Sequence, residues 1–150
     1  MTESANASSS FGSSQDFARV GFKTITNRLI MSGDLNAANT LFGGKLIQWV
    51  DEAGAVFVME LLRSHHIVTK KISEVLYNEP TKMGDVLEFL FRVKKVGATS
   101  VTVECVVRAK AIDHDDTLRL ILNCDLVFVK IDKLGRPVAH HYLQQNLSQE

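Results

Sequence analysis

The sequence has little cysteine, no excess of either charge and no long apolar run, and each shortage excludes a class of protein. The two cysteines, Cys105 and Cys124, lie in apolar stretches without a CxxC spacing and without a histidine at a ligand interval. Neither a disulfide framework nor a zinc site is therefore expected. We interpret both as small core residues of a protein in a reducing compartment. The sequence predicts no metal and no cofactor.

Positive and negative side chains balance, with 17 Lys plus Arg against 17 Asp plus Glu. A neutral chain has no overall field that would draw it to nucleic acid or to an anionic membrane. Asp51, Glu52 and Glu60 interrupt the longest apolar stretch, which falls short of the ~20 residues of a membrane span. The first residues lack the basic start and the apolar centre of a secretory signal. We expect a cytoplasmic protein with no nucleic-acid or membrane partner.

The 150 residues fit one domain with a tail at each end. Six of the first fourteen residues are serine, and a segment with so little apolar surface cannot offset the entropy that ordering would cost. We expect residues 1–16 to be a disordered Ser-rich tail. Residues 17–140 should form the domain, and residues 141–150 should be a C-terminal tail.

The domain has the pattern of one long helix among strands. Apolar residues recur every three or four positions from Gly43 to Arg63, which predicts a helix of ~30 Å that is covered on most sides. In Thr99–Ala109 apolar and polar residues alternate, as in a sheet with one buried face. An α+β fold is predicted, in which a curled antiparallel sheet of five to six strands wraps around the central helix. The expected strands are residues 17–31, 67–77, 85–96, 99–112 and 118–131.

The predicted helix begins with two glycines, Gly43 and Gly44, which are poor helix formers. Backbone N–H groups at a helix start have no intrahelical acceptor and lie at the positive end of the helix dipole. They can therefore polarise a carbonyl oxygen. The alternative is a tight turn that packs closely against a strand. The sequence agrees with both interpretations.

An acidic pair, Asp51 and Glu52, stands in the middle of the same helix. Asp51 follows Gly44 by seven residues, which returns it to nearly the same face but places it ~10 Å further along the axis. A carbonyl held by the glycine amides is then outside the ~3 Å that reaction with Asp51 of the same chain requires. If both serve one reaction, a second copy must supply one of them. The alternative is a solvated patch or a salt bridge; we expect Asp51 to point inward and Glu52 to be structural.

The segment NAANTLFGGKLIQWVDEA, residues 36–53, resembles the motif of the hotdog-fold acyl-CoA thioesterases. The small bacterial acyl-CoA hydrolases and the mammalian cytosolic tandem-hotdog acyl-CoA hydrolase are the most similar groups. The resemblance implies an enzyme that hydrolyses acyl-CoA to free fatty acid and CoA. It also implies pairing as a double hotdog homodimer, further assembled as a trimer of dimers. Other similar segments are VTKKI (68–72), Pro80 with MGDV (83–86), VGATSV (96–101) and KLGRP (133–137).

Carried over residue by residue, the resemblance implies an essential Asn36 and an essential Asp51 that come from opposite hotdog units. The amides of Gly43 and Gly44 would polarise the thioester carbonyl, and Asn36 would orient the water or the carbonyl. Asp51 would either activate water or attack directly. Asn39 stands where the family usually has glycine; asparagine tolerates a left-handed backbone, so we expect the turn to be kept.

Coenzyme A carries phosphates, so a neutral protein needs local basic groups to hold it. By resemblance and by their hydroxyl groups, Thr99 and Ser100 after the Gly97 bend are expected to contact the pantetheine. The candidate CoA-binding residues are Gly97, Thr99, Ser100, Lys94, Arg108 and Arg136.

Two other functions fit a hotdog fold. A hydratase or dehydratase needs a histidine in the loop before the helix, and residues 31–42 contain none. A non-catalytic acyl-CoA-binding protein generally carries an added DNA-binding helix pair or a basic surface, whereas the only segment that this chain has to spare is a Ser-rich tail without Lys or Arg. Trp49, Phe57 and Met59 either close an acyl tunnel or belong to the core.

Overall fold

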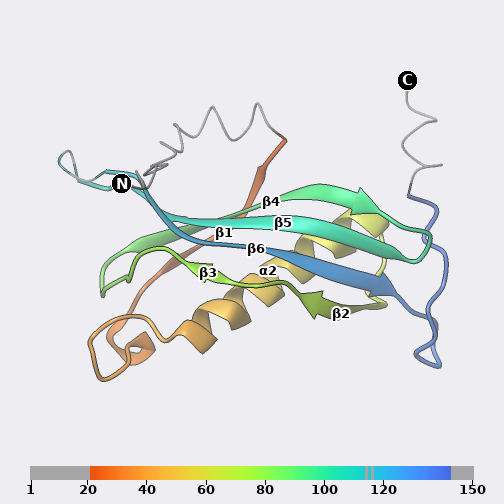
Figure 1. Cartoon of the computed structure of the whole chain (residues 1–150), viewed down its shortest axis with the longest axis horizontal. Helices are drawn as coiled ribbons and strands as arrows, with labels where there is room; N and C mark the ends of the chain where they lie inside the picture. The colour runs from red at the N-terminus through yellow and green to blue at the C-terminus, as the bar shows by residue number, and fades with distance from the viewer. Residues whose placement is uncertain (1–20, 114, 116, 143–150) are drawn as a thin grey trace, which may run out of the picture.

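The fold is given by a computed structural model, which describes residues 21–113, 115 and 117–142. The predicted Ser-rich tail, the beginning of the first predicted strand and most of the C-terminal tail lie outside these residues. The described chain forms one long helix, a short 3-10 turn and six strands (Figure 1). In chain order these elements are β1 (Lys23–Leu29), η1 (Ser32–Asp34), α2 (Gly43–Leu62), β2 (Ile67–Ile72), β3 (Leu76–Tyr77), β4 (Val86–Val96), β5 (Ser100–Ala109) and β6 (Arg119–Lys130).

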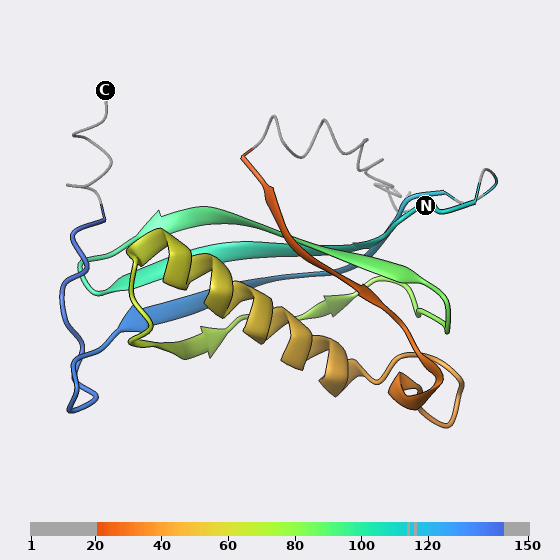
Figure 2. The same ribbon diagram turned by 180° about the vertical axis from the view of Figure 1, so that it is seen from behind.

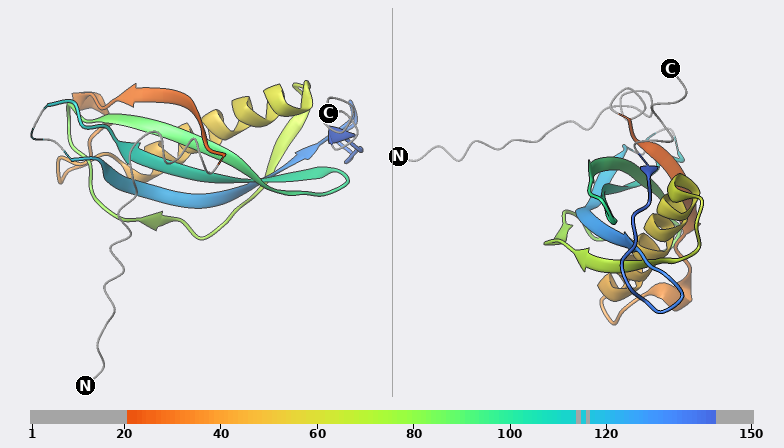
Figure 3. Two further views of the ribbon diagram at one scale, coloured as in Figure 1. Left: turned by 90° about the horizontal axis from the view of Figure 1, so that it is seen from above. Right: turned by 90° about the vertical axis from the view of Figure 1, so that its right-hand side faces the viewer.

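The six strands form one antiparallel sheet in the order β1-β4-β5-β6-β2, and β3 also pairs with β6. The helix lies along one face of this sheet (Figure 2). Seen from the end, the sheet curls around the helix (Figure 3). The predicted α+β architecture and the predicted number of strands are confirmed. No helix of the described chain is long and apolar enough to cross a membrane.

The prediction of one strand over residues 67–77 was wrong, because Ser73 interrupts the pairing with β6. The Ser73 N–H donates to the carbonyl of Asp125 at 2.9 Å, as in a regular ladder. The Asp125 N–H, however, donates to the Ser73 hydroxyl at 2.9 Å instead of a backbone carbonyl. Serine side chains compete with backbone acceptors in this way. The segment is therefore divided into β2 and β3.

The helix ends at Leu62, one residue before the predicted end, because Arg63 adopts a left-handed conformation with φ 50°. The pairing of β1 with β4 shifts in register between Thr24 and Thr26. Helix periodicity and strand composition thus located these elements to within a few residues.

The core lies between α2 and the sheet face that contacts it. The predicted buried face of β5 is confirmed, because Val101, Val103, Cys105 and Val107 are all fully buried. Both cysteines are free and buried, as expected of core residues. They are directly opposite each other on β5 and β6.

Trp49 and Phe57 of the helix belong to this core. Trp49 packs edge-on against Phe89, and Phe57 stacks on Phe91 with ring centroids 5.9 Å apart. Burying an aromatic side chain of this size stabilises the fold by roughly 1.5–3 kcal/mol. The core interpretation of these two residues is confirmed.

A third glycine in the helix, Gly54, has a packing role that the sequence did not indicate. A Cβ at this position would lie 3.1 Å from Phe128 and 3.1 Å from Phe91. Glycine costs a helix about 1 kcal/mol relative to alanine, but here it allows two rings of the sheet to approach the helix backbone. Gly54 therefore sets the distance between helix and sheet.

On the opposite face of the sheet, Arg108 forms a buried ion pair with Glu88. The Arg108 Nε donates to Glu88 at 2.7 Å, and the side chains are 1% and 8% exposed. The Thr24 hydroxyl donates to the other carboxylate oxygen. Burial raises the pKa of Glu88, but the hydrogen bonds from Arg108 and Thr24 outweigh it, so the pKa lies below its ordinary value.

We predict that Glu88→Gln reduces the acid sensitivity of the fold. A carboxylate with a lowered folded pKa contributes stability above its unfolded pKa of about 4.3, and this is lost as pH falls through the folded pKa. The substitution should cost about 3–5 kcal/mol at pH 7, because the Arg108 charge stays buried without its partner. Below about pH 4.5 the difference should shrink. Urea unfolding from pH 7 to pH 3 measures both effects.

Glu60→Gln is the matched control, because Glu60 forms an exposed pair with Lys23 at 3.6 Å. This variant should unfold as the wild type does at every pH. Parallel stability curves for Glu88→Gln and the wild type would contradict the prediction.

Candidate active site

Backbone hydrogen bonds to two neighbouring segments hold the start of α2 in place. The Leu41 N–H donates to the carbonyl of Thr81 at 3.0 Å, and the Phe42 N–H donates to Asp34 at 3.1 Å. Phe42 is the N-cap, and its side chain makes no capping hydrogen bond. No described residue accepts a hydrogen bond from the backbone N–H of Gly43 or Gly44. These donors are available to a ligand.

The two glycines differ in their surroundings. A Cβ on Gly43 would lie 3.1 Å from the hydroxyl oxygen of Tyr77, whereas a Cβ on Gly44 would meet nothing within 4 Å. The Tyr77 hydroxyl donates to the Gly43 carbonyl at 2.9 Å. The interpretation of a glycine packed against a strand therefore holds for Gly43. Gly44 is exposed, and close packing does not account for it.

A cavity of about 450 Å³ lies beside the helix start. Apolar side chains from the helix, the preceding loop and β6 form part of its wall, and Tyr77 and Asn78 form another part. The lining residues are Thr40, Leu41, Gly43, Leu46, Tyr77, Asn78, Glu79, Pro80, Thr81 and Ile121. This combination of an apolar wall and unpaired backbone donors suits an uncharged carbonyl on an apolar chain.

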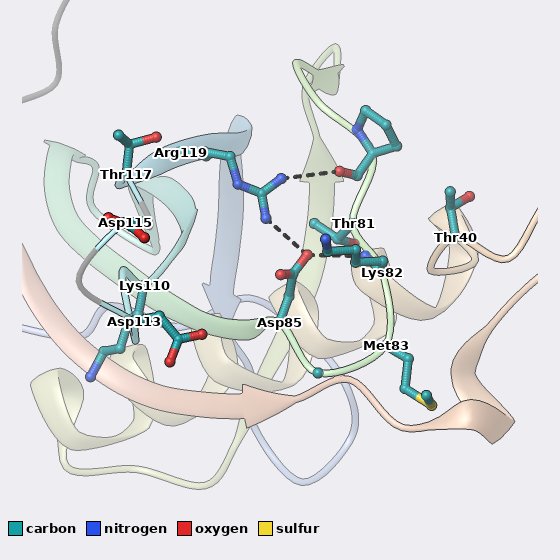
Figure 4. A pocket seen from close by; sticks show the side chains of 12 residues that line it. Thr40, Thr81, Lys82, Met83, Asp85, Lys110, Asp113, Asp115, Thr117 and Arg119 are labelled. Atoms are coloured by element: carbon teal, nitrogen blue, oxygen red, sulfur yellow. Dashed lines mark hydrogen bonds and ion pairs between the residues drawn. The ribbon is translucent and has the colours of Figure 1, made fainter.

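A larger cavity of about 730 Å³ shares Thr40, Pro80 and Thr81 with the first. Figure 4 shows its charged lining: Arg119 reaches across to Asp85 and to the carbonyl of Pro80. Two lysines and two aspartates also line it. The other lining residues are Lys82, Met83, Gly84, Lys110, Asp113, Asp115 and Thr117.

Asn36 organises the loop that leads into the helix. Its carbonyl oxygen accepts hydrogen bonds from the N–H groups of Ala38 and Thr40 at 2.9 and 3.2 Å, and its amide donates to the Thr40 hydroxyl at 3.0 Å. Asn39 has φ 59°, so the left-handed turn expected at this position is present. Thr40 of this loop lines both cavities.

Asp51 and Glu52 occupy different environments. Asp51 is half-buried and accepts a hydrogen bond of 2.6 Å from the hydroxyl of Thr69 on β2. Glu52 is exposed and pairs with Arg28 of β1 at 3.2 Å. The expectation of a structural Glu52 is confirmed, and Asp51 points toward the edge strand β2.

The structure does not bring Asp51 to the helix start of the same chain. Asp51 lines neither cavity, and it follows Gly44 by seven positions on a helix that runs continuously from Gly43 to Leu62. This separation corresponds to ~10 Å along the axis.

Gly97, Thr99 and Ser100 form the tight connection between β4 and β5. The Gly97 N–H donates to the Ser100 carbonyl at 2.9 Å. This hairpin and the helix start lie at opposite ends of the folded domain (Figure 1). The 11 residues of β4 span ~35 Å between these ends, so one chain cannot place both at one site.

The three predicted basic contacts are all paired. Lys94 donates to Asp125 at 2.6 Å, and Arg136 donates to Asp132 at 3.1 Å, both at the surface. The hydrogen bond from Lys94 to Asp125 raises the pKa of Lys94. Arg108 lies in the buried pair with Glu88, where a phosphate in solvent cannot reach it.

Sequence reasoning missed Tyr77 and the charged residues of the larger cavity. No spacing pattern marks Tyr77, because its contact with Gly43 joins residues far apart in the chain. Among the described residues, no three His, Cys, Asp or Glu side chains gather as a metal site requires.

Comparison with known proteins gives consistent matches. The family model of the thioesterase superfamily matches residues 38–113, about half of the chain. The acyl-CoA thioester hydrolase YciA of Escherichia coli is 27% identical over 117 residues, which cover 77% of this chain and 88% of the relative. The hexameric thioesterase of Yersinia pestis has a similar structure, with a TM-score of 0.73, 25% identity and coverage of 79% and 94% of the two chains.

The acyl-CoA hydrolase of Staphylococcus aureus, solved with butyryl-CoA and CoA, is 28% identical with a TM-score of 0.71, over 79% of this chain and 70% of that one. Two further structures of that hydrolase carry alanine in place of an asparagine and of an aspartate. The two replaced positions are as many residues apart as Asn36 and Asp51.

Proposed function

We propose that this chain, which belongs to the thioesterase superfamily, hydrolyses acyl-CoA to free fatty acid and CoA. The observation that carries the proposal is the pair of unsatisfied backbone N–H groups of Gly43 and Gly44 beside an apolar cavity. Relatives that match most of this chain are acyl-CoA thioester hydrolases. The spacing from Asn36 to Asp51 supports the same reaction.

In the proposed reaction, the thioester carbonyl accepts hydrogen bonds from the helix start, chiefly from Gly44. Water attacks the carbonyl carbon, the carbonyl oxygen gains negative charge, and the C–S bond then breaks to release CoA. Donors aimed at an oxygen that gains charge stabilise the transition state. Asp51 either takes the proton from this water and passes it to the departing CoA sulfur, or attacks the carbonyl itself, expels CoA and forms an acyl–Asp51 anhydride that water then cleaves to the free acid.

Asn36 is proposed to orient the attacking water or the carbonyl. Its amide nitrogen carries two N–H groups, and one of them bonds to Thr40 at 3.0 Å. The second can donate to a ligand. The hydrogen bonds to Ala38 and Thr40 fix the orientation of the side chain, so this donor is held before substrate binds.

A homodimer is proposed to supply Asp51 to the helix start of the other chain. Strand β2 is at an edge of the sheet, and the apolar Val68 on β2 and Val56 on α2 are 44% and 46% exposed. Two-fold pairing of two β2 edges would satisfy their backbone groups and cover these side chains. By analogy with the hexameric relative, we extend the assembly to a trimer of dimers.

Two-fold pairing also bears on the proposed CoA contacts. The two-fold axis makes the partner's strands run opposite to those of this chain. The partner's β4–β5 connection would therefore lie at the same end as the helix start of this chain. Gly97, Thr99 and Ser100 are proposed to contact the pantetheine from there, with Lys94 and Arg136 near the phosphates. The buried Arg108 is left out. Acyl-CoA is then a substrate and no resident cofactor is proposed; a cytoplasmic location stays a prediction.

We predict that Asp51→Asn lowers kcat for CoA release by at least about 10²-fold, the contribution of a general base. A thiol-release assay on acyl-CoA measures it. Glu52→Gln is the matched control and should stay within about twofold of the wild type, because Glu52 lies in an exposed salt bridge, a class worth at most ~1 kcal/mol. Tight binding of acyl-CoA without CoA release, in wild type and variant alike, would instead indicate a non-catalytic binding protein.

We predict that two inactive chains restore activity when mixed. An Asp51→Ala chain keeps its helix start, and a Gly44→Val chain keeps its Asp51 but crowds the N–H groups; Gly44 has open space, so the valine should not disturb folding. After co-refolding, random pairing should yield roughly a quarter of the wild-type rate. Activity no higher than that of each variant alone would rule out a shared site.

We predict that Lys94→Gln raises KM for acyl-CoA several-fold but leaves KM for the matching S-acyl-pantetheine unchanged, because only the former carries nucleotide phosphates. Lys110→Gln, in the larger cavity, is the control and should change neither value. If Lys110→Gln raises KM for acyl-CoA and Lys94→Gln does not, the phosphates lie in the larger cavity and not at the partner's hairpin.

A further inference from the structure

The Tyr77 hydroxyl contacts the peptide group that joins Gly43 to Gly44. The contact is at the carbonyl end, opposite the Gly44 N–H. The Oη of Tyr77 donates to the carbonyl oxygen of Gly43 at 2.9 Å. In a trans peptide the C=O and the N–H point in opposite directions. The Gly43 carbonyl points along the helix, and the Gly44 N–H points out of its start, toward the proposed position of the thioester.

Tyr77 is well placed to fix this peptide, because pairing with β6 holds its backbone. Its own position pairs with Leu122 of β6, and the next N–H, of Asn78, donates to Ile121 at 2.8 Å. The Asn78 side chain donates to Asn123 at 3.1 Å. The phenol is therefore anchored to the central part of the fold and not to a mobile loop.

The contact explains why the first helical residue is a glycine. A Cβ on Gly43 would lie 3.1 Å from the hydroxyl oxygen and 3.3 Å from the ring carbon that carries it. Any larger residue would require the hydroxyl and the ring to shift by a few tenths of an ångström. The glycine thus favours the observed position of the tyrosine, although the two are 34 positions apart in the sequence.

A hydrogen bond to a peptide carbonyl has two effects on the N–H at the other end. It fixes the plane of the peptide, and it polarises the group so that the N–H becomes a stronger donor. A phenol has an ordinary pKa of about 10, and partial burial raises the pKa of Tyr77 further, so the hydroxyl is protonated and donates at neutral pH.

We infer that Tyr77 is a positioning residue for the thioester site: its hydroxyl orients and polarises the Gly43–Gly44 peptide, so that the Gly44 N–H stabilises the charge on the carbonyl oxygen. The inference deepens the proposed function and rests on it for its catalytic part. Tyr77 need not touch the reacting atoms. It acts through the helix backbone, and its effect should be larger on the transition state than on bound substrate.

The test is Tyr77→Phe, which keeps the ring and removes the hydroxyl. We expect kcat for acyl-CoA hydrolysis to fall about 5- to 10-fold, less than the ~10²-fold loss of a whole oxyanion donor, with KM within about twofold. The matched control is Tyr142→Phe at the only other tyrosine of the sequence, which should keep the wild-type kcat. A purely structural role would change KM and unfolding together and would not lower kcat alone.

A second measurement does not depend on activity. The ¹⁵N and ¹H chemical shifts of the Gly44 amide respond to hydrogen bonding at the Gly43 carbonyl, so Tyr77→Phe should move them while Tyr142→Phe should not. Unchanged Gly44 shifts, or a Tyr77→Phe enzyme with wild-type kcat, would overturn the inference. A wild-type protein that releases no CoA would refute the proposed function instead, and the Gly44 shifts would still report on the Tyr77 contact.

Discussion

The rise of an α-helix is the constraint on which the proposed site depends. Gly44 and Asp51 are on one helix and nearly on one face, but ~10 Å of axis lies between them. A regular helix that packs along its length against a sheet cannot shorten this distance. The donors and the carboxylate can therefore meet only across two chains, and the fold leaves the edge of β2, next to Asp51, open for such pairing.

The packing that stabilises the helix also fixes the position of its first turn. Hydrogen bonds from Leu41 to Thr81 and from Tyr77 to Gly43 tie the helix start to neighbouring segments, while Gly54 lets the sheet approach the middle of the helix. Because these contacts hold the backbone from behind, the N–H groups in front need no side-chain cap. The fold itself fixes their direction, and the proposed site requires such fixed donors to stabilise charge without reorganisation.

The sequence was sufficient where the structure depends on neighbours along the chain. The helix and the long strands follow from periodicity. The left-handed turn at Asn39 was expected from the family resemblance, since asparagine tolerates the conformation of the glycine that the family usually has there. Contacts between distant residues were not predictable. Ser73 divides a strand only because Asp125 faces it, and Arg108, proposed for phosphate binding, is buried because the register of the sheet places Glu88 beside it. Periodicity describes which face a residue occupies but not what it meets there.

The two glycines at the helix start show what the sequence could and could not decide. Both are unfavourable for a helix, and the sequence offered close packing and ligand binding as explanations without separating them. The structure assigns close packing to Gly43, whose hydrogen atoms face the Tyr77 ring, and leaves Gly44 with open space. A residue that loses about 1 kcal/mol of helix stability without a packing gain calls for another reason. In the proposed mechanism the unobstructed approach of a carbonyl to its N–H supplies one, and the geometry of Gly43 then becomes a condition for the proposed chemistry at Gly44.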